Sequence, residues 1–147
     1  MIPFRARDVR HDGGQALLEF GLSVPVFLAV VYGICDFGRA LYTYDLVTSA
    51  ARVGSRYAIV HGSSCAIAGC PVSAAAIQTY VQSKVNGVNA SQLSVATTWS
   101  TAPGCTDPAF KGPQCRVTVT VSYPFAFYLA LNQTIPMTSS SQMVISQ

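Results

Sequence analysis

Charged side chains are scarce in this chain. Lysine and arginine together number 9 and aspartate and glutamate 6, so only 10% of the 147 residues are charged. An ordinary soluble domain carries about 25%, so part of this chain is expected to avoid water. The net charge is only +3, and the basic residues are scattered rather than clustered. This pattern argues against nucleic-acid binding.

Histidine is also rare, since the chain holds only His11 and His61. The sequence contains no G-x-S-x-G, no H-E-x-x-H and no glycine-rich phosphate loop to surround a catalytic group. We therefore predict that the protein is not an enzyme. No catalytic residue, no cofactor and no small-molecule substrate are expected.

The most informative feature that is present is an apolar run, Ala16–Cys35, with a single charge at Glu19. About 20 apolar residues are enough for a helix to cross a membrane. An ionised carboxylate costs roughly 2.5–3.5 kcal/mol at the centre of such a helix, so we expect Glu19 to have a partner. Arg5, Arg7 and Arg10 precede the run, and this positive charge predicts that the N-terminus stays in the cytoplasm.

A basic start followed by an apolar run is also found in signal peptides, lipoproteins and uncleaved membrane anchors. A secretory signal peptide would have a shorter apolar region that ends in an A-x-A-like site, and the sequence offers no convincing one. A lipoprotein would need a small residue before Cys35, where Ile34 stands. The remaining alternative is an uncleaved single-span envelope anchor, with Glu19 near the cytoplasmic interface and a disulfide-stabilised binding domain outside.

The residues in and after the run carry a family resemblance. Gly14 is followed by Glu19 and Phe20, and Pro25 lies further along the run. The segment Gly33–Ala58, GICDFGRALYTYDLVTSAARVGSRYA, then shows D-F-G-R and A-A-R-x-G-S-R-Y-A patterns. In their order and spacing these residues resemble the TadE-like family of minor pseudopilins, from the Tad-type (Flp, tight adherence) branch of type IV pilins.

The resemblance implies a structural or assembly-priming subunit of a Tad-type (type IVc) pilus assembly and secretion system that supports surface adhesion. A prepilin peptidase would cut between Gly14 and Gln15, and the freed amino group would pair with Glu19 of a neighbouring subunit, beside Phe20. The implied partners are this peptidase, other Tad pilins and pseudopilins, the inner-membrane assembly platform and membrane lipid. The implied location is the bacterial inner (cytoplasmic) membrane, crossed once with the C-terminal domain periplasmic, or the pilus itself.

The helical pattern continues beyond the apolar run. Residues 37–60 contain no proline, and residues suited to one helix face recur at three- or four-residue intervals, namely Leu41, Tyr44, Val47, Ala51, Gly54 and Ala58. A helix over residues 16–60 would be about 68 Å long, against a hydrocarbon core of about 30 Å. Its second half must therefore stand outside the membrane. Pro25 should kink or loosen one turn of the first half.

Small and basic residues are expected on different faces of the outer half of this helix. Ala50, Gly54 and Ala58 lie four residues apart, and we expect them to fit beneath the strands of the same domain. Arg52 and Arg56 are also four residues apart and are expected on a solvated face. The helix therefore presents one side to a sheet and another to water.

The rest of the chain predicts an α+β fold. A second helix is expected over residues 72–85, with Ser73 as N-cap and Gly87 as its stop. Alternating apolar residues predict strands near residues 93–99, 117–122 and 137–145. The expected architecture is pilin-like, with the long N-terminal helix packed on a small antiparallel sheet and a second short helix beside it. The aromatic stretch Tyr123–Tyr128 is interpreted as a covered edge of the core.

Three segments describe the expected organisation of the chain. Residues 1–14 form a basic leader that is cleaved, and residues 15–36 form the transmembrane half of the long helix. Residues 37–147 form one extracytoplasmic pseudopilin domain that includes the other half of that helix. About 110 residues are enough for a single compact domain with a modest core.

Four of the 5 cysteines form two local pairs after the long helix, Cys65 with Cys70 and Cys105 with Cys115. In an exported domain they indicate disulfides, although four cysteines allow three connectivities. The C-x4-C and C-x9-C spacings do not resemble those of structural zinc sites, so we expect no metal at His61. Cys35 is left over and is predicted to be a buried apolar thiol.

Overall fold

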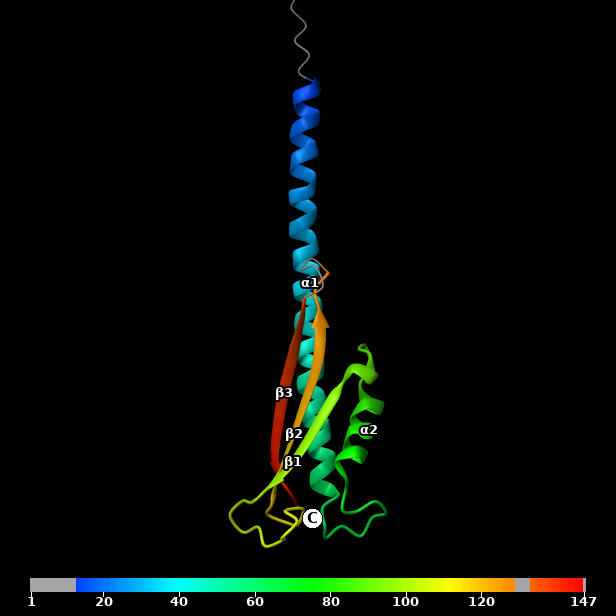
Figure 1. Cartoon of the computed structure of the whole chain (residues 1–147), viewed down its shortest axis with the longest axis vertical. Helices are drawn as coiled ribbons and strands as arrows, with labels where there is room; N and C mark the ends of the chain where they lie inside the picture. Colours follow the sequence, from blue (N-terminus) through cyan, green and yellow to red (C-terminus); the bar gives the residue numbers. More distant parts are fainter. Residues whose placement is uncertain (1–12, 129–132, 147) are drawn as a thin grey trace, which may run out of the picture.

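The computed structural model describes residues 13–128 and 133–146. Its dominant element is the helix α1, Gly13–Val60, which is 48 residues long. Figure 1 shows the first half of α1 projecting as a bare rod beyond the rest of the molecule. This helix is long and apolar enough to cross a membrane, with a mean hydropathy of 2.0 in its most apolar window, none of which is buried. The helix continues through Pro25, and Figure 1 shows no sharp bend in that half.

The second half of α1 packs against a small antiparallel sheet, with a short helix at its side (Figure 1). The strands are hydrogen-bonded in the order β1-β2-β3. The predicted α+β fold is therefore confirmed. In chain order the elements after α1 are α2 (Ala74–Lys84), the short 3-10 helix η1 (Ala90–Gln92), β1 (Ser94–Ser100), β2 (Arg116–Ala126) and β3 (Thr134–Val144).

Helix α2 begins and ends at residues that the sequence singles out. The Ser73 hydroxyl accepts a hydrogen bond from the Ala76 backbone N–H at 3.2 Å, which confirms Ser73 as the N-cap. Gly87 follows the helix with φ at +97°, a conformation that favours glycine. A Cβ atom there would lie 2.8 Å from the hydroxyl oxygen of Tyr42, so the loop after α2 approaches α1 closely.

The core lies between the two helices and one face of the sheet. On β2, the alternating residues Val117, Val119 and Val121 are fully buried, as expected for a strand with one covered face. Ile77 and Val81 on α2 are also fully buried. Burying one such side chain contributes roughly 1.5–3 kcal/mol to the free energy of unfolding, so the packing of the helices on the sheet is the main source of the domain's stability.

The face that α1 turns toward the sheet differs in part from the prediction. Leu41 and Tyr44 are more than half exposed, whereas Asp36, Ala40 and Thr43 are buried at the same level of the helix. The apolar pattern was misleading here because the strands lie close to α1 and leave room only for small or hydrogen-bonded side chains. Thr43 satisfies its hydroxyl by donating to the Arg39 carbonyl oxygen at 2.9 Å.

Further along α1 the small residues lie beneath the sheet as expected. Ala50 and Ala58 are buried, and a Cβ atom at Gly54 would lie only 2.9 Å from methyl groups of Val119 and Val81. Ser55 is fully buried next to them. Its hydroxyl oxygen lies 2.8 Å from that of Ser141 on β3, which satisfies a polar group inside the core. Arg52 and Arg56 are exposed on the other side, as predicted.

The two predicted cysteine pairs are at disulfide distance. The Cα atoms are 6.1 Å apart in Cys65–Cys70 and 4.5 Å apart in Cys105–Cys115. The Cys35 side chain is exposed on α1, so the described chain itself does not bury this thiol, and its burial within the span stays a prediction. It lies on the bare half of the helix, where no part of the described chain covers the surrounding side chains.

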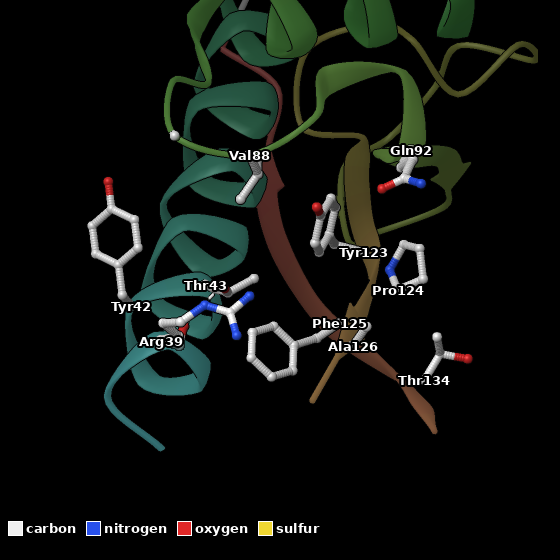
Figure 2. Close-up of a pocket in the computed structure, with 11 residues that line it drawn as sticks. Arg39, Tyr42, Thr43, Val88, Gln92, Tyr123, Pro124, Phe125, Ala126 and Thr134 are labelled. Atoms are coloured by element: carbon white, nitrogen blue, oxygen red, sulfur yellow. Dashed lines mark hydrogen bonds between the residues drawn. The ribbon is translucent and has the colours of Figure 1, made fainter. Parts of the chain in front are cut away.

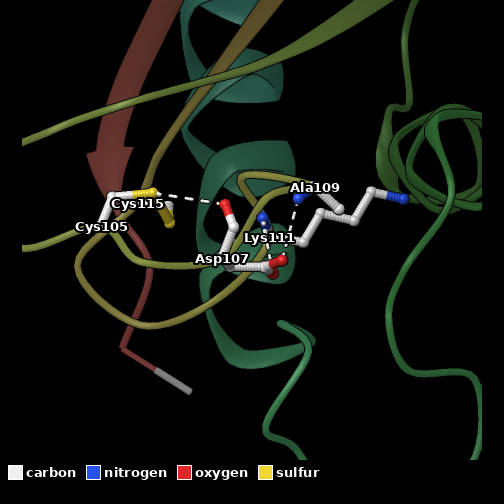
Figure 3. Close-up of a disulfide and its surroundings, with 5 residues drawn as sticks. All are labelled: Cys105, Asp107, Ala109, Lys111 and Cys115. Carbon is white, nitrogen blue, oxygen red and sulfur yellow. Dashed lines mark hydrogen bonds between the residues drawn. A yellow bond between two sulfur atoms is a disulfide. The ribbon is translucent and has the colours of Figure 1, made fainter.

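The loop between β1 and β2 is organised by Asp107 (Figure 3). One carboxylate oxygen accepts the Ala109 backbone N–H at 2.9 Å and the other accepts the Lys111 N–H at 3.1 Å. The bond from Ala109 is the largest cause that holds the pKa of Asp107 below its ordinary value of 3.8, and it outweighs the smaller opposing effect of desolvation. The Ser63 hydroxyl and the Lys111 and Gly112 N–H groups act in the same direction.

The close packing at Gly54 makes a test of the core. In Gly54→Ala the added methyl group must displace two stiff, buried valines, which costs about 1–3 kcal/mol, while the higher helix propensity of alanine returns up to about 1 kcal/mol. Gly38→Ala on the same helix is the matched control, because nothing lies within 4 Å of its added Cβ. We expect chemical unfolding of the full chain in detergent to show Gly54→Ala less stable than wild type and Gly38→Ala at least as stable. Equal stability of the two variants would contradict the close packing.

The lowered pKa of Asp107 predicts a pH dependence of stability. Because the folded pKa lies below 3.8, the carboxylate stabilises the fold fully above that pH, and this contribution is lost as the pH falls through the folded value. Asp107→Asn should therefore lose less stability than wild type when the protein is acidified from neutral pH. The measurement is the free energy of unfolding at neutral and acid pH, with Asp45→Asn on the exposed side of α1 as control. An unchanged acid sensitivity in Asp107→Asn would contradict this role.

Candidate functional site

The residues predicted to act in processing and assembly lie together at the start of α1. Gly14, Gln15, Glu19 and Phe20 are all exposed on this helix. The bond between Gly14 and Gln15 lies in the first turn. The leader arginines at positions 5, 7 and 10 lie outside the described residues. The structure therefore places these four residues on one short stretch of accessible helix, which is where a peptidase or a neighbouring subunit could reach them.

Glu19 is the only acidic or basic residue on the bare half of α1 before Asp36. Its backbone carbonyl oxygen accepts the Ser23 hydroxyl at 2.8 Å. Within residues 13–128 and 133–146, no hydrogen bond or ion pair reaches its carboxylate. The side chains around it are exposed and apolar, among them Leu18 and Leu22. A carboxylate in these surroundings is stabilised only by a group from another molecule or by water.

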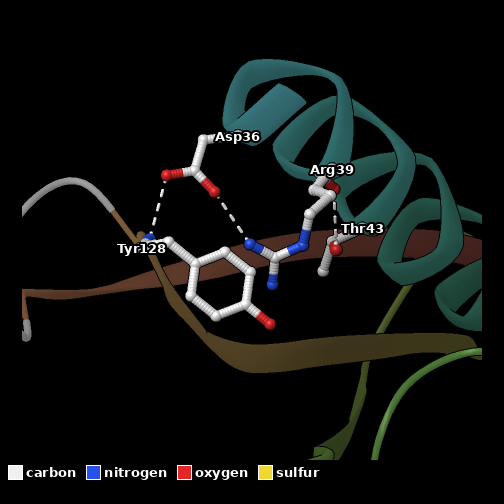
Figure 4. A network of polar contacts seen from close by, with 4 residues as sticks. All are labelled: Asp36, Arg39, Thr43 and Tyr128. Atoms are coloured by element: carbon white, nitrogen blue, oxygen red, sulfur yellow. Dashed lines mark hydrogen bonds and ion pairs between the residues drawn. The ribbon is translucent and has the colours of Figure 1, made fainter. Parts of the chain in front are cut away.

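A second polar centre lies at the opposite end of the bare half, around Asp36 (Figure 4). The Asp36 side chain is buried, and its two oxygens accept different donors. The Arg39 guanidinium donates to one at 2.8 Å, and the Tyr128 backbone N–H donates to the other at 2.9 Å. This contact joins α1 to the end of β2 and closes the globular part at the level where the apolar run stops.

Arg39 also stacks on aromatic rings in this centre. Its guanidinium carbon lies 4.0 Å from the ring centroid of Tyr128 and 5.3 Å from that of Phe125. Such cation–π contacts add about 0.5–2 kcal/mol each, depending on exposure. The sequence gives no signal for this centre beyond the D-F-G-R pattern, which contains its two charges. The stretch interpreted as a covered core edge is divided, since Phe125 is buried and Tyr128 is 80% exposed.

A cavity of about 400 Å³ opens next to Arg39 (Figure 2). Helix α1, the loop after α2 and the end of β2 form its walls, and Arg39 is the one charged residue among the described residues that line it. Among the described residues that line it, none is a carboxylate, histidine or cysteine. The polar groups among these residues are hydroxyls, one amide and the Arg39 guanidinium.

The far end of the globular part holds His61 within an aromatic stack. The Tyr57 ring lies between His61 and Tyr80, with centroid distances of 4.1 and 4.0 Å. His61 Nδ1 lies 2.9 Å from the Tyr57 carbonyl oxygen. Among the described residues, no three histidine, cysteine or acidic side chains are grouped so that they could hold a metal ion. His61 therefore has a packing partner and a hydrogen bond rather than a set of metal ligands around it.

Comparison with known proteins finds a match over most of helix α1. The family model described as TadE-like protein matches residues 14–56, which include the Gly14–Phe20 stretch, Asp36, and Ala50 and Gly54 beneath the sheet. No curated protein and no solved structure matches the chain. The TadE-like family is a pilus-associated structural family that is not known for catalysis. Residues 14–56 of this chain, most of its long N-terminal helix, therefore resemble TadE-like proteins.

Proposed function

We propose that the chain is a minor pseudopilin of a Tad-type pilus system, which primes or joins the assembly that supports surface adhesion. In this proposal residues 1–14 are a leader removed by a prepilin peptidase, and residues 15–36 anchor the protein in the inner membrane. Residues 37–147 form the extracytoplasmic domain. The observation that carries the proposal is Glu19, which stands unpaired within the described chain on an exposed apolar helix.

The proposed partner of Glu19 is the amino group of a neighbouring subunit, created when the bond after Gly14 is cut. Removing two charges from water costs nearly as much as their attraction returns, so the pair would set the register of neighbouring helices more than their affinity. The exposed apolar surface of the same helix would provide most of the cohesion once it is covered by other helices. The Glu19 ion pair would therefore align neighbouring subunits, and the apolar helix surface would hold them together.

An uncleaved single-span anchor is the second candidate, and one observation favours it. The bond between Gly14 and Gln15 lies within the first turn of α1, whereas proteases generally act on extended chain. Against this, Gly13 and Gly14 each weaken a helix by about 0.5–1 kcal/mol relative to alanine. The first turn can therefore unwind at little cost when a peptidase binds.

Maturation and assembly can be tested on the same cells. We expect the membrane-extracted protein to begin at Gln15 when the prepilin peptidase is present and to retain residues 1–14 when it is absent, as shown by intact mass and N-terminal sequencing. Glu19→Ala should still be inserted and cut but should fail to co-purify with the pilus components, because the amino group of its neighbour has no partner.

Two further variants separate charge from shape. Glu19→Gln keeps the size and a hydrogen-bonding group without the charge, so it should assemble less than wild type. Ser23→Ala, one turn along the helix, is the control and should assemble normally. A chain that keeps residues 1–14 in both strains would favour the uncleaved anchor, and normal assembly of cleaved Glu19→Ala would disprove the pairing.

A further inference from the structure

We propose that the globular part has its own membrane-contacting surface, formed by Arg39 and Tyr128, which rests in the headgroup layer beside α1. The occupant of this surface is lipid. The inference rests on the proposed crossing of the membrane by the first half of α1, and it goes further, because it gives the domain a second contact away from the helix axis.

The height of Tyr128 above the membrane follows from one hydrogen bond. The apolar run ends at Cys35, and the next residue, Asp36, accepts the Tyr128 backbone N–H at 2.9 Å. The end of β2 is thereby held at the level where the hydrocarbon would stop. Arg39 lies four residues beyond Cys35, which is about 6 Å along a helix at 1.5 Å per residue. The headgroup layer on each side of a bilayer is about 5–7 Å thick, so Tyr128 and Arg39 fall within it.

The exposed side chains at this level are of the kinds found at membrane interfaces. Tyr128 is 80% exposed, although it is aromatic. Tyrosine is enriched at the boundary between lipid and water, because its ring is apolar and its hydroxyl group can remain hydrated. The Arg39 guanidinium, stacked on the Tyr128 ring, can place its remaining N–H groups among lipid phosphates.

The hydrogen bonds of Asp36 allow its carboxylate to lie next to the hydrocarbon. A bare carboxylate next to hydrocarbon would be costly. Here each carboxylate oxygen already has a donor, one from Arg39 and one from Tyr128, and the side chain is only 5% exposed. The acid can therefore sit at the edge of the lipid without depending on water. Exposed apolar side chains of the span, such as Ile34, lie on α1 just before this level.

A second membrane contact, at a distance from the axis of α1, would restrict the orientation of the domain relative to the bilayer. One helix anchors a domain but leaves its rotation about the helix axis free. With Tyr128 also in the headgroup layer, the sheet would keep one tilt and one rotational setting relative to the bilayer. The consequence is that every subunit would present the same side of its domain to partners before assembly.

The test uses the depth of single tryptophans in the full chain, reconstituted in vesicles of phosphatidylethanolamine and phosphatidylglycerol. The native Trp99 is paired with Val117, about 30 Å along β2 from Ala126, so it reports on a site far from lipid. Two further chains carry Trp99→Phe together with either Tyr128→Trp or Phe27→Trp. Tryptophan at position 128 preserves the stacking on Arg39, and position 27 lies near the middle of the apolar run.

We expect a nitroxide just below the lipid headgroup to quench most of the emission from position 128 and little of that from Trp99. A nitroxide near the chain end should quench the probe at position 27. Quenching at 27 without quenching at 128 would overturn the inference and leave the span intact, and protection of 128 from aqueous iodide would then show that a second protein copy covers it. Absence of quenching at 27 would refute the span, and the inference with it.

Discussion

The whole structure depends on one helix that must satisfy two different surroundings. Along the first half of α1, side chains such as Leu18 and Leu22 are exposed and apolar, which is stable only in lipid or against other helices. Along the second half, Ala50, Gly54 and Ala58 allow the strands to approach closely. Because a helix makes its hydrogen bonds within itself, the same backbone serves both surroundings without a break.

Between the two halves of α1, at Asp36, the fold depends on hydrogen bonds to a buried carboxylate. The carboxylate of Asp36 holds Arg39 from its own helix and the backbone of Tyr128 from the sheet. The globular part is thereby attached to α1 at both of its ends, since the Ser146 N–H donates to the Ile59 carbonyl oxygen at the far end. Between these two ends the core is held by apolar packing together with the buried Ser55–Ser141 hydrogen bond.

Much of this arrangement could be predicted because its signals are local. The apolar run, the Ser73 cap, the alternating valines of β2 and the two cysteine pairs are each written in a short stretch of sequence. The Asp36–Tyr128 contact could not be predicted, because its residues are separated by 92 positions and the donor is a backbone group. The side of α1 near Leu41 was misassigned because close packing there favours small and polar residues over large apolar ones.

The central claim is that lipid covers one half of α1 and protein covers the other. The most direct measurement is amide hydrogen exchange along α1, on the full chain in lipid nanodiscs, with and without moderate urea. The account predicts that both halves are protected without urea, and that urea exposes residues 40–58 together with β2 while residues 16–35 stay protected. Simultaneous loss of protection in both halves, or fast exchange of residues 16–35 in lipid, would contradict it.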